Sequence, residues 1–544
     1  MAKHIIIVHG YLLSGSGSNI YSCNLTMQWK KQGHAVTVFC QDPQAGTYDW
    51  VDEFFTSKDE WPQHPPSPGQ VRVVVPDIAG LLPVYNYNEY DGYTVKTIPN
   101  CSDEEIERHI EMTSREIRRA VTAWGCNQVL SNHALLSPVN TTRALEGTNV
   151  PFNIKIHGSA LSFVIKPFPR YKKYALEAMA KCNKIIAGTR HVVKQVLDIF
   201  KEELDHDPKG DLDLKRKLVI VPPGMDPTVF SPLRDSIKNQ ESFRREVENH
   251  IAEKGDGRRA EKINFPALSS SSSEAHSKLV ELGTTYDQRV VDADLLSRLP
   301  TFSPDEPVIM YIGHFLHTKG VAEILLSFPA IVKRLPKARL LLVGYGTFRE
   351  HLMLMINAMT TGDINLFKAA AHSPDERGKP FLDSSIEIDK YFRQLEPSEV
   401  SRITVTGYLN HTELGFILPL ASVLVVASKW SEAFGMVAVE AMSAGVLPLC
   451  VYHSGLVDVL DRVKETDPEL ESLMHMEIKN GGDFELGSGA SFMEVFTPKV
   501  LEILQHLFPA TGGKEIRALT SERLREVAVS TWSWDGICKK LLEL

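Results

Sequence analysis

Two glutamates eight positions apart, Glu432 and Glu440, lie in a stretch whose residue types suit the binding of a ligand. An apolar run at 423–427 precedes them, and a helix-forming run follows the turn at Phe434-Gly435. The order strand, loop, helix places backbone N–H groups at a helix N-terminus, which binds anions. A carboxylate beside such a site suits a ligand that also has hydroxyls, because it accepts two hydrogen bonds from a diol. A sugar nucleotide offers both groups.

A lysine and a histidine are further candidates for chemistry. Lys319 follows an apolar run at 307–312 and opens a helical pattern. A cation there could stabilise a diphosphate that departs with negative charge, and an ordinary surface lysine is the alternative. His157 ends the apolar run at 152–156 and could contact a ligand, because open α/β sheets bind ligands at the carboxyl ends of their strands. A buried histidine with a structural role is the alternative for this residue.

A loop with two glycines follows the first apolar run of the chain. Gly15 and Gly17 alternate with serines there, and such a loop can approach a phosphate or an acceptor closely. The spacing is not a complete Gly-x-Gly-x-x-Gly fingerprint, so it gives little support to a dinucleotide site. An ordinary turn explains the same residues equally well.

Apolar β-branched runs alternate with amphipathic segments in both halves of the chain. This alternation predicts an α/β fold with parallel sheets and helices on both faces. The predicted strands are 4–9, 34–40, 71–75, 129–132, 152–156, 184–187, 217–221, 307–312, 338–343, 402–406, 423–427 and 446–451. The predicted helices are 18–32, 102–124, 167–181, 189–204, 319–334, 346–358, 410–419 and 436–444.

The composition is that of an ordinary globular protein of 544 residues, which is long enough for two or more domains. A net charge of −9 gives no support to nucleic-acid binding. The seven cysteines include no Cys-x-x-Cys pair, which disfavours a zinc ribbon or a redox dithiol, and their odd count and wide spacing fit a reducing compartment. The apolar run at 5–8 is too short for a signal sequence, and the longest apolar stretch, 414–427, is too short for a membrane span. We therefore expect a cytoplasmic protein.

Composition also suggests where the domains end. Prolines at 222–223 predict a stiff crossing between an N-terminal Rossmann-like domain, 1–222, and a linker with a charge-rich insertion, 223–304. A C-terminal Rossmann-like domain is predicted at 305–530, and a helix at 531–544 could pack back on the N-terminal domain. Within 223–304 the helical piece 243–252 resembles an insertion more than core. The stretches 359–397 and 462–492 are predicted as further excursions, the first polar and irregular and the second acidic and then glycine-rich.

The second half resembles the donor domain of the family-4 retaining glycosyltransferases with the GT-B fold. Four pieces occur in the order of that family: Gly313-His314-Phe315-Leu316-His317-Thr318-Lys319-Gly320, Leu341-Leu342-Val343-Gly344-Tyr345-Gly346, Val405-Thr406-Gly407-Tyr408-Leu409 and the block from Glu432 to Glu440. A Glu-x7-Glu spacing alone is unspecific, but a buried strand before it and Ala-Met-x-Ala-Gly after it make it specific. The resemblance is strong over most of 305–460 and looser over 1–232. It implies two Rossmann-like domains facing a cleft, with helical insertions.

The resemblance also implies roles for residues. Glu432 would face the donor sugar, Glu440 would hold the ribose hydroxyls, and Lys319 would neutralise the leaving diphosphate. His157 would reach the donor sugar or the acceptor across the cleft. The residues expected to contact the rest of the donor are Gly15, Gly17, His314, Gly407, Tyr408, Leu409, Phe434, Gly435, Met436 and Val437. Of these, the amides of 435–437 would hold the diphosphate, and 407–409 would lie under the base.

One position departs from the family pattern. His314 stands where the family usually has arginine, which is always charged and binds phosphate with two hydrogen bonds. A histidine titrates near neutrality and gives one bond at a time. We hypothesise that activity falls as His314 loses its proton, which a pH profile unchanged in His314→Gln would disprove.

The expected reaction is transfer of a sugar from a nucleotide diphosphate sugar, with UDP favoured, to an acceptor hydroxyl with retention. No metal or other cofactor is expected, and the acceptor could be a small molecule, a glycan or a lipid-linked compound. The alternatives are a GT-B phosphorylase and a nucleotide-sugar-binding scaffold with weakened catalysis. Six basic residues and one acid within 166–184 could make a weak peripheral membrane contact, or they could be an ordinary solvated face.

Overall fold

A computed structural model describes residues 2–13, 16–85, 90, 92–206, 212–233, 235–254, 291–346, 348–374, 378–478 and 489–544. The chain forms two compact units. Unit 1 consists of Met1–Gly224 and Trp534–Leu544, and unit 2 consists of Met225–Ser533. In the described part of the chain, no helix is both long and apolar enough to cross a membrane.

Unit 1 contains a parallel sheet in the order β10-β9-β8-β7-β1-β2-β4-β3. Its strands are β1 (His4–Val8), β2 (Ala35–Phe39), β3 (Glu53–Thr56), β4 (Val71–Val75), β7 (Gln128–Asn132), β8 (Phe152–Lys155), β9 (Lys184–Ala187) and β10 (Leu218–Ile220). A separate parallel pair joins β5 (Leu81–Val84) and β6 (Thr94–Thr97). The strand order reverses between β1 and β7, and ligands of open α/β sheets bind at the carboxyl ends of strands beside such a point.

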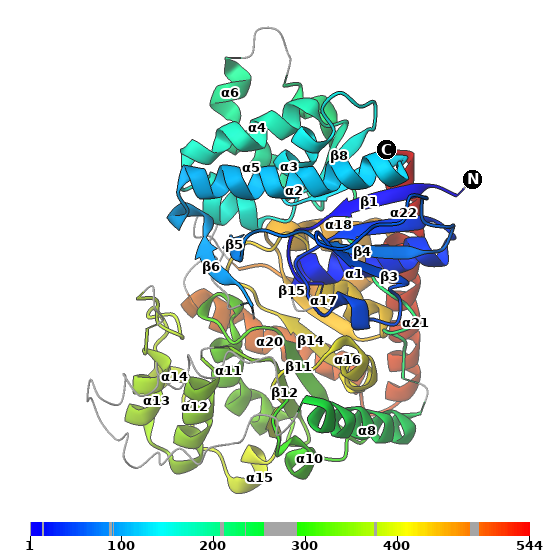
Figure 1. Cartoon of the computed structure of the whole chain (residues 1–544). Helices are drawn as coiled ribbons and strands as arrows, with labels where there is room; N and C mark the ends of the chain where they lie inside the picture. The colour runs from blue at the N-terminus through cyan, green and yellow to red at the C-terminus, as the bar shows by residue number, and fades with distance from the viewer. Residues whose placement is uncertain are drawn as a thin grey trace. The chain divides into compact units, whose positions relative to one another are not determined.

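Helices cover both faces of this sheet because its strands are apolar on both sides (Figure 1). Ile5 and Ile7 of β1 share a core with Trp29 and Ile537, whereas Ile6 of the same strand packs in the core that contains α2. The helices of unit 1 are α1 (Gly17–Lys31), α2 (Asp103–Trp124), α3 (Ser137–Ala144), α4 (Lys172–Lys181), α5 (Arg190–Ile199), α6 (Lys201–Asp205), α7 (Leu214–Lys217) and α22 (Trp534–Glu543). A capping box between Ser102 and Glu105 starts α2.

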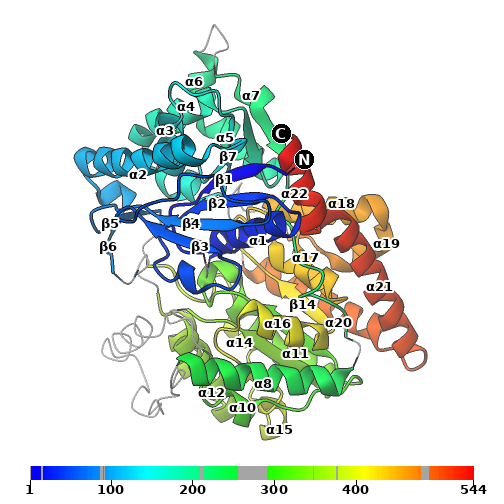
Figure 2. The same cartoon turned by 45° about the vertical axis from the view of Figure 1, so that its right-hand side comes forward.

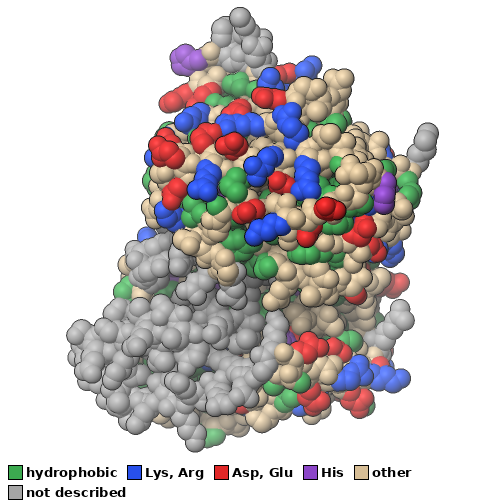
Figure 3. Space-filling model, in the orientation of Figure 1, with side chains coloured by type: hydrophobic (Ala, Val, Ile, Leu, Met, Phe, Trp, Pro, Cys, Tyr) green, Lys and Arg blue, Asp and Glu red, His purple; other side chains and the backbone are tan. Residues whose placement is uncertain are grey.

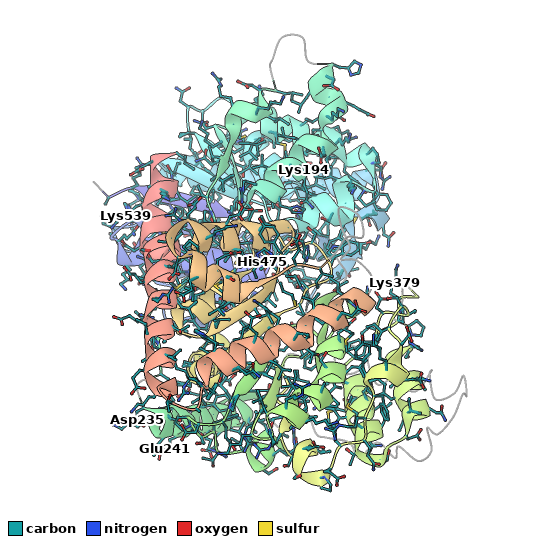
Figure 4. The ribbon with its side chains drawn as sticks, turned by 180° about the vertical axis from the view of Figure 1, so that it is seen from behind. Lys194, Asp235, Glu241, Lys379, His475 and Lys539 are labelled. Carbon is teal, nitrogen blue, oxygen red and sulfur yellow. The ribbon has the colours of Figure 1, made fainter. Side chains whose placement is uncertain are left out.

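The C-terminal helix α22 packs against α1 and completes unit 1. Lys3 Nζ donates a hydrogen bond to the carbonyl oxygen of Leu542 (2.7 Å), and Gln32 Nε2 donates to Asp535 (3.1 Å). Lys539, labelled in Figure 4, pairs with the same Asp535 one turn earlier on α22 (2.7 Å). The hydrogen bonds from Lys3 and Gln32 thereby tie α22 to the N-terminal part of unit 1, whereas the ion pair of Lys539 lies within α22.

Unit 2 contains a second parallel sheet, in the order β13-β12-β11-β14-β15-β16. Its strands are β11 (Val308–Ile312), β12 (Arg339–Val343), β13 (Ile403–Val405), β14 (Val423–Val426), β15 (Leu447–Val451) and β16 (His475–Met476). Its helices are α8 (Ser236–Lys254), α10 (Leu295–Arg298), α11 (Val321–Arg334), α12 (Arg349–Thr361), α13 (Ile364–Ala371), α14 (Ile388–Tyr391), α15 (Pro397–Val400), α16 (His411–Ile417), α17 (Met436–Ser443), α18 (Ser454–Thr466), α19 (Pro468–Met474), α20 (Gly489–Leu507) and α21 (Gly513–Trp532).

Two segments that the sequence predicted as excursions contribute to the core of unit 2. Helix α8 lies beside α16 (Figure 2), and the side chains of Phe243 and Val247 are fully buried there. Phe381 stacks on Phe348 with ring centroids 4.4 Å apart. The prediction that 243–252 lies outside the core is therefore wrong, and 359–397 is not irregular throughout, because it contains α13 and α14. A few large apolar side chains anchor these charged segments.

Candidate active site

The side chains of Lys319 and Glu432 form an ion pair in unit 2. Glu432 also accepts a hydrogen bond from the hydroxyl of Ser428, and the carbonyl oxygen of Ser428 is hydrogen-bonded to His453 Nε2 (2.7 Å). The side chains of Lys319 and Glu432 keep 31% and 22% of their surface exposed, so a ligand can reach both. The structure therefore brings together the cation and the carboxylate that the sequence proposed for one site.

A close approach of two loops produces this ion pair. Gly320, directly after Lys319, has φ +73°, and a Cβ atom there would lie 2.5 Å from the carbonyl oxygen of Ala427. Only glycine lets this loop come so near the end of β14. The N–H group of Lys429 then donates to the carbonyl oxygen of Thr318 (2.7 Å), which fixes the two loops to each other.

Glu432 is ionised at neutral pH. Burial alone would raise the pKa of its carboxyl group, but Lys319 and the hydroxyl of Ser428 more than offset this effect and lower it. A charged carboxylate accepts hydrogen bonds only, so it suits the hydroxyl groups of a sugar.

The backbone around Glu432 is held by the start of α18. Its N–H group donates to the hydroxyl of Ser454 (2.9 Å), and its carbonyl oxygen accepts from the N–H group of Gly455 (2.8 Å). A Cβ atom on Gly455 would come within 2.6 Å of the backbone of Ala433. Sequence reasoning missed the residues 453–455, although their position directly after β15 was a usable signal.

Helix α17 begins beside the ion pair. Gly435 precedes it with φ +108°, and a Cβ atom there would lie 2.4 Å from Leu456. The first N–H groups of a helix have no partner within the helix, so those near Met436 and Val437 can bind an anion. The side chain of Phe434, in contrast, is 6% exposed and packs toward Trp532, so it anchors the loop in the core.

Glu440 lies about one turn into α17 and is buried, with 5% of its surface exposed. Burial raises the pKa of its carboxyl group, and His411, whose Nε2 is 3.9 Å from the carboxylate, offsets part of this rise. A carboxyl group that is this deeply buried is well suited to receive hydroxyl donors from a ligand.

A second group of predicted residues follows β11, β12 and β13. His314 is exposed, and its Nε2 is hydrogen-bonded to the hydroxyl of Tyr345 (2.9 Å). The ring of Tyr345 meets that of Tyr408 edge to face, with centroids 5.4 Å apart. Gly407 accepts a hydrogen bond from the N–H group of Gly344 (3.0 Å). Leu409, also predicted to bind the donor, is 4% exposed.

Tyr311 connects the two groups. Its hydroxyl donates to the carbonyl oxygen of His314 (2.8 Å). Burial, together with the carboxylates of Glu432 and Glu323, raises the pKa of Tyr311 well above its usual value, so the hydroxyl remains a donor. Because β13, β12, β11 and β14 are neighbours in one parallel sheet, the loops after them share its carboxyl edge.

In unit 1, His157 belongs to a group of buried aromatic rings. Its Nε2 is hydrogen-bonded to Asn132 Oδ1 (2.7 Å), and its ring lies 5.1 Å from that of His133, which in turn stacks on His9 (5.5 Å). Burial lowers the pKa of His133 and His157 well below the usual value and that of His9 to about 4, so all three are neutral at pH 7. His9 and His133 were missed, although each follows a strand of the sheet.

The remaining predictions for unit 1 stay open. Gly15 lies outside the described residues. Gly17 begins α1, and a Cβ atom there would meet nothing within 4 Å, so no contact requires glycine. Within the basic stretch, Lys172 pairs with Glu203 (3.0 Å), and Figure 3 shows acidic and basic side chains intermixed on the face of unit 1 that it displays. The membrane contact remains a prediction.

Comparison with known proteins identifies the fold. Residues 389–465 match the family model described as glycosyl transferases group 1, and this segment includes Glu432, Glu440 and the start of α17. The comparison with curated proteins found no match.

Solved structures resemble the whole chain. Sucrose-phosphate synthase from Thermosynechococcus elongatus is 14% identical, covers 99% of this chain and 98% of its own, and has a TM-score of 0.53. A glycosyltransferase from Rickettsia africae is 14% identical over 100% of this chain and 97% of its own, with a TM-score of 0.53. An alpha,alpha-trehalose-phosphate synthase (UDP-forming) from Burkholderia xenovorans is 10% identical. The match covers 100% of this chain and 99% of that protein, with a TM-score of 0.50.

These likenesses confirm the predicted α/β fold with parallel sheets, which is the GT-B fold of glycosyltransferases. The segment 389–465 carries the sequence pattern of glycosyl transferases group 1. His314 and Lys319 lie outside that segment.

Proposed function

We propose that the protein is a retaining glycosyltransferase that transfers a sugar from a nucleotide diphosphate sugar to an acceptor hydroxyl. The observation that carries the proposal is the ion pair between Lys319 and Glu432 beside the N-terminus of α17. An anion-binding helix end, a cation and a partly exposed carboxylate together match the diphosphate and the hydroxyls of such a donor. The match of 389–465 to glycosyl transferases group 1 supports the same reaction class.

Each group in the site has a task in this reaction. The bond between the anomeric carbon and the diphosphate oxygen breaks, and its electron pair stays on the diphosphate. Lys319 and the amides near Met436 and Val437 stabilise that charge. Glu432 holds the sugar by its hydroxyls, and Glu440 accepts hydrogen bonds from the ribose. The acceptor oxygen attacks the same face of the sugar, and its proton passes to the departing diphosphate.

Three further points extend the proposal. We favour UDP as the nucleotide, in keeping with the UDP-forming enzyme of the same fold. We retain His157 as a ligand-binding residue of unit 1. We also retain a cytoplasmic location, because all seven cysteines, which the structure describes, are free thiols.

Thermal stabilisation by UDP-, GDP- and ADP-sugars tests the donor assignment, since a ligand that binds only the native state raises the unfolding temperature. We expect a UDP-sugar to stabilise the wild type more than the other two classes do. Release of UDP in the presence of sugar acceptors then tests turnover. Release of sugar phosphate only with inorganic phosphate would indicate a phosphorylase, and binding without turnover would indicate a scaffold; either result would overturn the proposal.

A further inference from the structure

The ring of His314 packs on the ring of Tyr345, with centroids 4.3 Å apart, and the two are joined by the hydrogen bond between Nε2 and the hydroxyl. His314 itself is exposed. Tyr345, at 8% exposure, is buried and can serve as a fixed partner.

The backbone on both sides of Tyr345 is fixed by close packing. Gly344 and Gly346 have φ +154° and +135°. A Cβ atom on Gly344 would lie 1.8 Å from the carbonyl oxygen of Gly313, and one on Gly346 would lie 3.1 Å from the backbone of Phe315. The N–H group of Phe315 also donates to the carbonyl oxygen of Tyr345 (2.7 Å). The loop that carries Tyr345 is therefore fastened to the loop that carries His314.

A second histidine, His250, supports Tyr345 through Tyr408. The ring of Tyr345 meets the ring of Tyr408, and the ring of Tyr408 meets that of His250 at 87° with centroids 6.4 Å apart. His250 Nδ1 in turn pairs with Glu413 Oε1 (2.5 Å), and both of these side chains are buried. Helix α8, which the sequence assigned to an insertion, thereby supports the candidate donor site.

We propose that Tyr345 is a positioning residue that orients His314 toward the diphosphate of the donor. This inference rests on the proposed function. When the tyrosine hydroxyl donates to Nε2, the neutral imidazole carries its proton on Nδ1, and that nitrogen becomes the donor that a phosphate oxygen requires. The tyrosine thus allows a histidine to bind phosphate at this position. An arginine would need no such partner, because its planar guanidinium group already presents a fork of donors.

A double-mutant cycle on UDP binding, measured by calorimetry, tests the inference. Tyr345→Phe removes only the hydroxyl and should weaken UDP binding about fivefold, the effect of one hydrogen bond. In the His314→Arg background the same change should leave UDP affinity within about twofold, because arginine binds phosphate by itself. Tyr391→Phe, a half-buried tyrosine of the same core, is the matched control and should change nothing in either background.

The outcomes separate the two proposals. If the wild type binds no nucleotide, the proposed function fails and the positioning role of Tyr345 fails with it. If the wild type binds UDP and Tyr345→Phe binds it equally well, the positioning role is wrong. An equal loss in both backgrounds would show a purely structural role for Tyr345 and would also overturn the inference. Unfolding temperatures without ligand, similar for all variants, verify that each protein is folded.

Discussion

The ammonium group of Lys319 pairs with the carboxylate of Glu432, although 113 positions separate them in the chain. One follows β11 and the other follows β14, which are adjacent strands of the parallel sheet of unit 2. Both residues thus reach the same edge of the sheet, and Gly320 permits the close approach of their loops. A donor diphosphate would take up the ammonium group and leave Glu432 to the sugar.

Lys319→Ala should reduce kcat by about 10²–10³-fold, because one donor to the developing charge is lost. The unfolding free energy should change by less than about 1 kcal/mol, because the ion pair is partly exposed. Steady-state kinetics and urea unfolding measure the two effects. Lys429→Ala gives a contrast: its ammonium pairs with the fully buried Glu323 (2.5 Å), so its loss should destabilise the fold more.

Glu440→Gln should weaken nucleotide binding without destabilising the protein. Burial raises the pKa of Glu440 in the folded state, so its contribution to stability is lost as pH rises above the ordinary value of about 4.3. Glutamine removes the ionisable group from this buried position but accepts fewer hydrogen bonds from the ribose. We expect an equal or higher unfolding temperature and about tenfold weaker UDP binding. A fall in both the unfolding temperature and the UDP affinity would show that Glu440 has a structural role.

Gly435→Ala should lower both stability and nucleotide affinity. The positive φ of +108° is strained for any side chain, and an added Cβ atom would lie 2.4 Å from the side chain of Leu456, so either that side chain or the start of α17 must move. We expect the free energy of unfolding, measured with urea, to fall by about 1–3 kcal/mol. Gly33→Ala is the matched control, with φ +80° and nothing within 4 Å of the added atom. Gly33→Ala should lower the free energy of unfolding by less than Gly435→Ala does and should leave UDP binding unchanged.

Unit 1 should lose stability as pH falls from about 6.5 toward 4. The buried histidines of this unit with lowered pKa values are His4, His9, His109, His133 and His157. Because their folded pKa values lie below the unfolded value of about 6.5, the unfolded chain binds more protons over that range. Unfolding free energies at pH 7, 6, 5 and 4 measure this loss.

His133→Asn provides the test of that histidine group. Asparagine tolerates the left-handed backbone that His133 adopts at φ +72°. The variant should lose less stability between pH 6.5 and 4, by up to about 1.4 kcal/mol per pH unit. His64→Gln, an exposed histidine, should show the slope of the wild type. The prediction would be wrong if the His133→Asn slope matched that of the wild type.

Sequence patterns predicted the sheet strands whose residues are apolar and β-branched. Residues 71–75 form β4 as predicted, and the capping box at Ser102 marks the start of α2. Strand β3 was missed because its four residues include Glu53 and lie among polar neighbours. Helix α3 was missed because proline, serine and β-branched residues give it a weak helical signal, although it is almost wholly buried.

The candidate site likewise has a part that the sequence predicted and a part that it did not. The block from Glu432 to Glu440 is local in sequence, so its strand, loop and helix were readable. The contact of His314 with Tyr345 and the stacking of His133 on His9 join residues that are far apart in the chain. Residue types alone gave no signal for these pairs, because they arise only from the order of strands in each sheet.

Release of UDP from a UDP-sugar, measured with purified Glu432→Gln beside the wild type, tests whether the carboxylate paired with Lys319 serves sugar transfer. We expect that the wild type turns over and that Glu432→Gln loses about 10²-fold or more in kcat while remaining folded. Glu399→Gln, whose carboxylate pairs with Arg393 (2.8 Å) elsewhere in unit 2, should keep wild-type turnover. Wild-type turnover that persists unchanged in Glu432→Gln would contradict the account.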